Sequence, residues 1–397
     1  MGDTIKPFRA THYNPGLFND YSKLVCPPYD VISKGQLNRL RKKSPYNFSH
    51  ILIADKKNYK KAGKKFSEWV DKNILVDDNV AGFYFYEQHF KIDGRRLSRF
   101  GILCLLSMDE RSIFPHENTF KGPKIDRKRI LQTLKANLSP IFVISAKRID
   151  FLKDIRTKLM RKEPLIKFCD DEGNLNRAWN INETADIKKI CRGFERGKLV
   201  IADGHHRFEI SYDYFLKNKS RFKDLNWILA YVTGYQQGLV ILPTHRVAQV
   251  KNENEFFKKL KEVFGVFSVS RRKLEEKLKE KGDFRMGIYR RGKFYLLKLK
   301  DKGLLKQVDN PVYRKLDSYV FQKAVLPLFA IKGDIEYTHS IKEAKKISGD
   351  KKTAFLLRAV SLEEVVKVSS KGLKLPQKST YFYPKILSGI VLRRFKP

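Results

Sequence analysis

The sequence predicts a mixed α+β fold. In some segments apolar residues recur at helical spacing, as do Ala62, Phe66 and Trp69. In other segments, such as 82–90, apolar and polar residues alternate as they do in strands. Because the two patterns are mixed along the whole chain without an internal repeat, we expect helices packed on sheets.

The order of elements follows from caps, turn signals and periodicity. Ser33 and Asp126 are expected N-caps, and Asp93-Gly94 is a two-residue hairpin signal. In chain order we expect a helix after Ser33 through Leu40, a helix at 59–70, strands at 82–90 and 97–106, a helix from Asp126 to about Asn137, a strand at 140–145, a helix at 183–195, a strand at 199–202, a helix at 205–216, strands at 227–235 and 239–242, a hairpin turned at Arg290-Arg291-Gly292, a helix at 321–328, a strand at 353–360 and a helix at 362–368.

The 397 residues are too many for one compact core. We expect an N-terminal segment at 1–94, a core at 95–250 and a C-terminal α/β domain at 251–397. No run approaches the roughly 18 apolar residues that span a bilayer, and the first residues lack the apolar stretch of a secretory signal. The sequence therefore predicts a cytoplasmic protein with no membrane partner.

The chain is strongly basic, with 82 Lys and Arg against 43 Asp and Glu and a formal net charge of +39. Such a charge attracts polyanions. The basic residues are nevertheless dispersed, and no zinc finger, basic zipper or RNA-recognition signature accompanies them. We therefore favour a general bias toward lysine, and nucleic acid remains a possible partner that is not favoured.

The segment Asp203-Gly204-His205-His206-Arg207 carries the clearest chemical signal. A short apolar strand ends there, glycine allows a tight turn, and a helix begins. The first turn of a helix has free N–H groups and attracts anions, and Arg207 offers a fork suited to phosphate. Asp203, at or near the N-cap, could instead face a metal ion on the phosphates. The structural alternative is a capped helix whose histidines bond locally.

Weaker signals lie on both sides of this turn. Pro115-His116-Glu117 places a carboxylate that could act as a general base after a strand. Other polar residues at loops and strand ends could line the same pocket, although each is equally consistent with a solvated loop. They are Lys124, Arg127, Asn137, Ser139, Thr244, His245, Arg246, Lys378, Thr380 and Lys385.

A metal site is a further alternative. The potential zinc or two-metal ligands are His116, Glu117, Asp203, His205, His206 and His245. Adjacent histidines at one helix start point in different directions, and the helical spacing His-x-x-x-His is absent. This reading is therefore not favoured.

Several motifs in order resemble domain-of-unknown-function family 1015 over nearly the whole chain. They are Cys26-Pro27-Pro28-Tyr29-Asp30-Val31-Ile32, Pro115-His116-Glu117 with Thr119, Ala136-Asn137 with Ser139-Pro140-Ile141-Phe142, the Asp-Gly-His-His-Arg turn, Leu242-Pro243-Thr244-His245-Arg246, and Lys378 to Lys385. This family name supplies no activity.

A more distant resemblance supplies one. Pro-His-Glu followed by Asp-Gly-His-His-Arg resembles the ParB/sulfiredoxin-like superfamily, especially its free-serine kinases. This resemblance implies that the turn holds nucleotide phosphates and that Glu117 takes the proton from a serine hydroxyl. His205 stands where sulfiredoxins have a reactive cysteine, so sulfinic-acid repair is not expected. The two motifs lie farther apart than in a minimal domain because of an insertion at about 149–181.

The sequence therefore predicts a small-molecule kinase that transfers phosphate from ATP or ADP, with Mg²⁺ near Asp203, to a hydroxyl such as that of free L-serine, or runs the related phosphoserine reaction. The alternatives are a non-enzymatic, nucleotide-dependent DNA-binding or regulatory ParB-like protein and a metal-dependent phosphohydrolase. Predicted catalytic residues are Glu117, Asp203 and His205; predicted phosphate-binding residues are Gly204, His206, Arg207, Lys124 and Arg127; and a possible substrate pocket comprises His116, Asn137, Ser139, Thr244, His245, Arg246, Lys378, Thr380 and Lys385.

Overall fold

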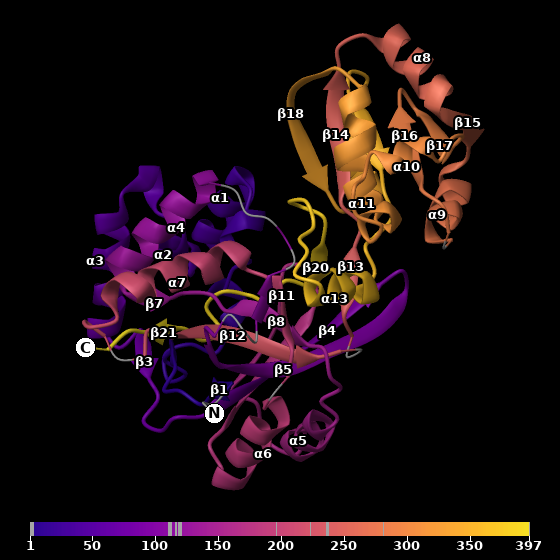
Figure 1. Cartoon of the computed structure of the whole chain (residues 1–397). Coiled ribbons are helices and arrows are strands. Elements are labelled where there is room, and N and C mark those ends of the chain that lie inside the picture. The colour runs from indigo at the N-terminus through magenta and orange to yellow at the C-terminus, as the bar shows by residue number, and fades with distance from the viewer. Residues whose placement is uncertain are drawn as a thin grey trace. The chain divides into compact units, whose positions relative to one another are not determined.

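The computed structural model describes residues 4–109, 113–115, 117, 121–195, 197–222, 224–235, 238–280 and 282–396. The chain forms two compact units. Unit 1 comprises 1–115, 119–239 and 384–397, and unit 2 comprises 116–118 and 240–383. The predicted division into three parts, with boundaries at residues 94 and 250, stays a prediction. The mixed α+β class is confirmed, because both units contain helices packed on sheets (Figure 1).

Unit 1 is built on a mixed sheet with the strand order β6-β11-β8-β12-β5-β4-β10-β9, and β1 pairs with the end of β5. The strands are β1 (Ile5–Lys6), β2 (Thr11–Tyr13), β3 (Leu75–Asp77), β4 (Phe83–Ile92), β5 (Arg95–Ser107), β6 (Ile113–Pro115), β7 (Ala136–Asn137), β8 (Ile141–Ser145), β9 (Ile166–Cys169), β10 (Leu175–Ile181), β11 (Leu199–Asp203), β12 (Trp227–Gly234) and β21 (Arg393–Arg394). The helices are α1 (Lys34–Lys43), α2 (Ser49–Leu52), α3 (Tyr59–Asp71), α4 (Lys121–Leu134), α5 (Phe151–Leu159), α6 (Thr184–Phe194) and α7 (His205–Asn218).

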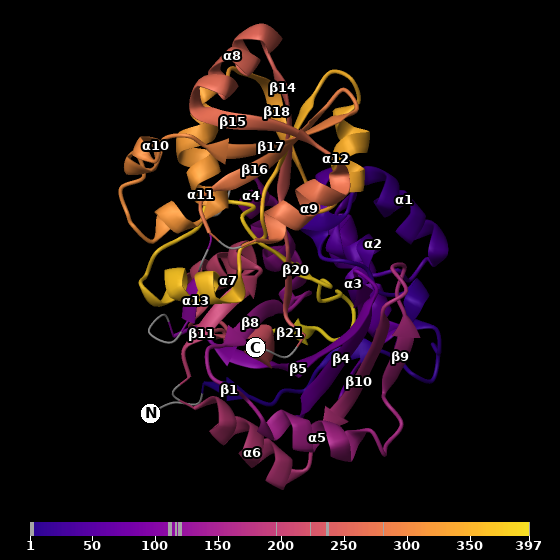
Figure 2. The same ribbon diagram turned by 90° about the vertical axis from the view of Figure 1, so that its right-hand side faces the viewer.

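Helices cover both sides of this sheet. In Figure 1, α5 and α6 lie on one side, and α3, α4 and α7 lie on the other. On the α5 and α6 side, alternate strand residues such as Phe85, Ile102 and Val143 pack with Leu152 and Phe194 in one buried cluster. Figure 2 shows β5, β4, β10 and β9 side by side. The expected insertion at about 149–181 thus contributes α5 and two strands of the main sheet.

The predicted hairpins are confirmed. β4 and β5 pair antiparallel around Asp93 and Gly94, whose φ angles of 48° and 80° are those of a two-residue turn with left-handed residues. In unit 2, Arg291 and Gly292 turn the second hairpin with φ angles of 43° and 80°. The twist of such turns matches the twist of the strands that they join.

One predicted helix start is wrong. α4 begins at Lys121, so Asp126 lies inside the helix rather than at its N-cap. The Gly122-Pro123 pair suggested a loop, but proline is tolerated in the first turn of a helix, where its missing N–H has no partner to lose. The helix ends at Leu134, and Asn137 belongs to β7, where it pairs with Arg393 of β21.

Unit 2 contains a second, antiparallel sheet with the order β15-β17-β16-β19-β14-β18 and a short β13–β20 ladder. Its elements are β13 (Val240–Leu242), β14 (His245–Val250), α8 (Glu253–Val263), β15 (Phe264–Val269), α9 (Arg271–Lys279), β16 (Arg285–Arg290), β17 (Lys293–Leu299), α10 (Gly303–Lys306), α11 (Asp317–Val320), β18 (Ile331–Thr338), α12 (Ile341–Ser348), β19 (Thr353–Leu356), α13 (Leu362–Ser370) and β20 (Tyr381–Tyr383).

Both faces of this second sheet are buried. Phe256 of α8, Phe321 and Phe355 share one apolar cluster, while Leu274 of α9 and Ala344 of α12 belong to a cluster that includes the alternate strand residues. The predicted helix at 321–328 is a π-helical turn followed by a 3-10 turn. Among the described helices of the chain, none has the length and apolar character of a membrane-spanning segment.

Candidate functional site

The predicted strand–turn–helix is present in unit 1. β11 is buried up to Ala202, Gly204 occupies the N-cap with φ 90°, and α7 begins at His205. A β-carbon at position 204 would lie 3.0 Å from Arg207 Nε and from Ile141 Cγ2. Both the left-handed backbone and the close packing therefore require glycine there.

The Asp203 side chain does not cap α7 but contacts the cationic side chains of two residues. Arg207 Nη2 donates to Asp203 Oδ2 at 3.2 Å, and Lys385 Nζ lies 3.5 Å from Asp203 Oδ1. The side chains of Arg207 and Lys385 are only 13% and 10% exposed, so water screens their charges poorly. Two cations on one carboxylate leave an excess of positive charge at this turn.

Buried contacts fix both cations in place. Arg207 also donates to the carbonyl of Pro140, at the start of β8. The backbone around Lys385 is held by two buried side chains, since Arg99 donates to the carbonyl of Pro384 and Gln88 donates to that of Lys385 at 3.2 Å. The charged turn is thus preorganised by the sheet.

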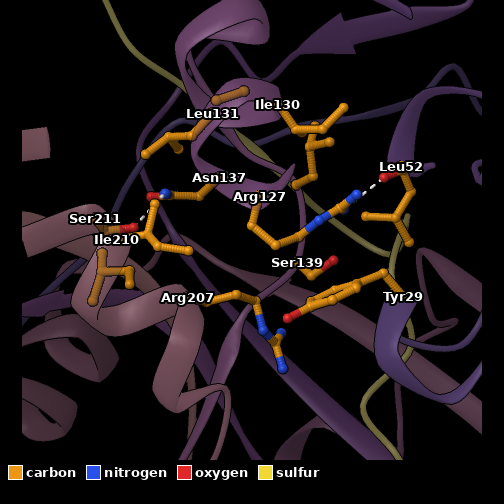
Figure 3. A pocket seen from close by; sticks show the side chains of 13 residues that line it. Tyr29, Leu52, Arg127, Ile130, Leu131, Asn137, Ser139, Arg207, Ile210 and Ser211 are labelled. Carbon is orange, nitrogen blue, oxygen red and sulfur yellow. Dashed lines mark hydrogen bonds between the residues drawn. The ribbon is translucent and has the colours of Figure 1, made fainter. Parts of the chain in front are cut away.

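A cavity of about 50 Å³ lies beside Arg207 (Figure 3). This is room for roughly three or four water molecules. Its walls come from α2, α4, β7 and the two residues that follow it, α7, β12 and the segment near Tyr29. The lining residues are Tyr29, Leu52, Arg127, Ile130, Leu131, Ala136, Asn137, Leu138, Ser139, Arg207, Ile210, Ser211 and Ile228.

Tyr29 and Arg127 form a polar wall of this cavity. The guanidinium of Arg127 lies 4.3 Å from the centre of the Tyr29 ring and donates to the carbonyl of Leu52 at 2.7 Å. In Figure 3 the hydroxyl of Tyr29 points toward Arg207. Burial raises the pKa of this hydroxyl, whereas the charges of Arg207 and Arg127 oppose the shift. The hydroxyl therefore remains a neutral donor over the physiological pH range.

The structure brings two further predicted residues to the cavity. Asn137 Nδ2 contacts Ser211 Oγ at 3.5 Å, and the Ser139 hydroxyl lies 2.6 Å from that of Ser388. Lys124 does not line the cavity and pairs with Glu209 of α7. His205 and His206 are half-buried in the first turn of α7.

The remaining described candidates form a separate group in unit 2. Glu117 Oε1 accepts from the backbone N–H of Lys378 at 2.7 Å, and Oε2 accepts from the Thr380 hydroxyl at 3.2 Å. Glu117 also forms a parallel bridge with Leu375. The carboxylate is therefore held in one orientation by the segment 375–380. His116 lies outside the described residues.

Arg246 and His245 are buried in β14. Arg246 donates to the carbonyl of Thr244 and, at 3.4 Å, to that of Lys378. Burial lowers the pKa of Arg246 to about 10. Burial and then the Arg246 charge lower the pKa of His245 to about 4, and its Nδ1 accepts from the N–H of Leu357 at 3.3 Å. His245 is therefore neutral at physiological pH.

The described ranges contain no group of three or more His, Cys, Asp or Glu side chains that could hold a metal ion. Asp203 is the residue predicted to face Mg²⁺. Because a cation already faces each of its oxygens, these residues do not fit a resident magnesium ion. The metal role of Asp203 stays a prediction.

Three residues of the site were not singled out in the sequence. Tyr29 and Ser211 reach the cavity from distant segments, and no local pattern shows this. Arg99 is fully buried, with its guanidinium 4.7 Å from the centre of the Phe142 ring. The sequence pattern could have shown that the Arg99 side chain points inward, because Arg99 lies on the same strand face as the apolar Leu103 and Leu105. A charge on an inward-facing position is unusual.

Comparisons with known proteins give one family and several distant structures. A free serine kinase in complex with AMP matches at 14% identity and TM-score 0.36, over 70% of this chain and 86% of that one. A conserved hypothetical protein from Pyrococcus furiosus matches at 16% and 0.37, over 72% and 92%. C-terminally truncated SbnI from Staphylococcus aureus matches at 13% and 0.38, over 72% and 85%. At these TM-scores the likeness establishes neither fold nor activity.

No curated protein matches the chain. The model of the family described as "Protein of unknown function (DUF1015)" matches residues 5–319, which is most of the sequence. The resemblance to family 1015 seen in the motifs is confirmed, and the chain belongs to this family.

Proposed function

We propose that the chain is a nucleotide-dependent phosphotransferase whose phosphate-binding element is the β11–α7 turn. The observation that carries this proposal is the convergence of Arg207 and Lys385 on Asp203, beside a cavity that Arg207 also lines. The excess positive charge is partly buried and fixed before any ligand binds. Such preorganised charge stabilises the developing charge of phosphoryl transfer.

The cavity supports phosphate as the bound group. Tyr29 and Arg207 both line it, and in Figure 3 the Tyr29 hydroxyl points toward Arg207. Both groups are hydrogen-bond donors, and an arginine fork matches phosphate oxygens geometrically. The remainder of the wall is largely apolar, and the low local dielectric of such a wall strengthens these interactions.

Glu117 is the base in this proposal, with free L-serine as the acceptor, and the core at 95–250 is ParB/sulfiredoxin-like. The serine hydroxyl oxygen bonds to the terminal phosphorus of ATP or ADP, the bond from that phosphorus to the bridging oxygen breaks, and the hydroxyl proton passes to Glu117. Two hydrogen bonds hold the Glu117 carboxylate in one orientation. The phosphoserine reaction uses the same groups in reverse. We derive no step through a metal ion.

Arg207→Gln and Lys385→Gln test the phosphate site. Each variant should lose nucleotide-induced thermal stabilisation and lower turnover by about 10²-fold or more, because each removes a preorganised cation. Phosphoserine formation from L-serine with ATP or ADP and Mg²⁺ is followed by phosphorus NMR. Lys158→Gln is the matched control, since Lys158 pairs with Asp186 at 2.8 Å on an exposed surface of unit 1.

The outcomes separate the parts of the proposal. Stabilisation by nucleotide that is lost in both variants, without phosphoserine, would keep the phosphate site and reject serine. Glu117→Gln that binds nucleotide and retains full turnover would reject the base. Wild-type protein that neither binds nucleotide nor forms product would reject the function as a whole.

A further inference from the structure

A row of lysines in and just before α3 lacks the acidic partners that the basic residues of α9 have. Lys57 precedes α3, and Lys60, Lys61 and Lys64 follow at helical spacing. All four are exposed, while Ala62, Phe66 and Trp69 form the buried face of the helix. No carboxylate in the described part of the chain lies within ion-pair distance of these four. We name them the α3 lysine row.

The α9 helix of unit 2 shows the ordinary arrangement. There Arg271 pairs with Glu275 at 2.7 Å and Arg272 with Glu276 at 3.0 Å. Such pairs four residues apart stabilise a helix, whereas like charges at that spacing destabilise it. The α3 lysine row therefore lacks the ion pairs that offset the repulsion between like charges in α9.

The charge continues onto the neighbouring helices of unit 1. Between residues 34 and 72 the chain has twelve Lys or Arg and only three Asp or Glu. Exposed Lys34, Arg39 and Lys42 of α1 also have no ion pair with a described carboxylate. The dispersal of basic residues along the sequence thus hides a local concentration of uncompensated charge in the fold.

We propose that the α3 lysine row binds the phosphate backbone of a double-stranded nucleic acid. Within α3 the row spans about 6 Å from Lys60 to Lys64 at the helical rise of 1.5 Å per residue, and Lys57 lies before the helix starts. A duplex presents one phosphate charge per roughly 1.7 Å of its axis, or about three or four along the helical part of the row. A polymer of closely spaced phosphates therefore matches all four lysines at once, without reading base sequence.

A membrane surface is a poorer match for this row. Membrane-binding helices place apolar side chains among their cations. The exposed large apolar residues of the described chain are Leu17, Val80, Ile125, Leu216 and Phe267, and none of them is on α3. Binding to the row is independent of the phosphotransferase proposal, which concerns α7 and Lys385.

The test compares two triple variants of the full chain that change its net charge equally. Lys60→Gln/Lys61→Gln/Lys64→Gln removes three lysines of the row, and Arg271→Gln/Arg272→Gln/Lys277→Gln removes three paired cations of α9. Binding of a labelled random-sequence DNA duplex is measured by fluorescence anisotropy between about 50 and 200 mM salt. Circular dichroism checks that both variants fold.

The α3 variant should bind more than about tenfold more weakly, and its salt slope should fall by about 2.7, since each phosphate contact contributes about 0.9. The α9 variant should bind like the wild type, and Lys60→Arg/Lys61→Arg/Lys64→Arg should retain binding. No wild-type binding, equal losses in both Gln variants, or binding to anionic phosphatidylserine vesicles but not to duplex would each overturn the proposal.

Discussion

The chain contains the dipeptide His-Arg twice, once at the start of a helix and once at the start of a strand, and the two copies have different environments. His206-Arg207 stands in the first turn of α7, where Arg207 is 13% exposed, pairs with a carboxylate and lines a cavity. His245-Arg246 stands in β14, where both residues are almost fully buried. Residue types and sequence neighbours alone do not distinguish these copies.

The partners of each arginine explain the difference. Arg246 is enclosed by Phe321 and Tyr337, whose ring centres lie 5.7 and 5.8 Å from its guanidinium, and it donates to backbone carbonyls. Arg207 shares Asp203 with Lys385 beside open volume. A cation enclosed in this way organises the fold around it, whereas one at the edge of a cavity can exchange a partner for a ligand.

Removing the enclosed arginine should have the largest effect on stability. Arg246→Ala leaves a cavity between two aromatic rings and removes the donor to the buried carbonyl of Thr244, so we expect a loss of about 4 kcal/mol in the free energy of unfolding of unit 2. Arg207→Ala should cost less, about 2 kcal/mol, because it removes the donor to the Pro140 carbonyl but leaves Asp203 paired with Lys385.

Tryptophan fluorescence separates the two units. All three tryptophans, Trp69, Trp179 and Trp227, belong to unit 1. In urea, Arg246→Ala should shift an early far-ultraviolet circular dichroism transition and leave the fluorescence midpoint near that of the wild type. Equal losses of stability from Arg246→Ala and Arg207→Ala would show that the contrast between the two dipeptides is wrong.

Acid should destabilise unit 2 through His245. The pKa of His245 is about 4 in the fold and about 6.5 when unfolded, so the unfolded state binds more protons between these values. The contribution of the neutral imidazole is complete above about pH 6.5 and is lost as the pH falls toward 4. The shift corresponds to about 3 kcal/mol.

His245→Gln isolates this dependence, since its amide oxygen can still accept from the N–H of Leu357. The free energy of unfolding of unit 2 is measured by chemical denaturation at a series of pH values between about 4 and 7. Plotted against pH, it should have a shallower slope for the variant than for the wild type. Parallel curves would mean that His245 takes up its proton in the folded state without cost.

Local patterns allowed the strand–turn–helix of the site to be predicted. The apolar run of β11, the turn at Gly204 and the apolar face of α7 lie in one continuous segment, so periodicity and turn chemistry identify them. The same local rules placed the helix start at Asp126, and failed there because a proline in the first turn looks like a loop.

The cavity could not be predicted, because its walls are assembled from distant parts of the chain. Tyr29, Leu52 and Ser211 are far apart in the sequence and meet only in the folded chain. Lys385 was singled out for its charge and its motif, but its pairing with Asp203 depends on buried Arg99 and Gln88, which hold residues 384–385 against the sheet. Such long-range contacts leave no periodic signal in the sequence.

Gly204→Ala tests the smallest expected effect. It asks whether the left-handed backbone at Gly204 holds the Arg207 guanidinium in position. The left-handed conformation costs an alanine about 1–2 kcal/mol, and the new β-carbon would lie 3.0 Å from Arg207 Nε. Gly94→Ala is the matched control, because Gly94 has φ 80° but open space around an added β-carbon. Both variants should lose similar stability by tryptophan fluorescence, but only Gly204→Ala should also reduce nucleotide-induced stabilisation. If Gly94→Ala reduced it equally, the turn would act through the stability of unit 1, and the position of Arg207 beside the cavity would not explain binding.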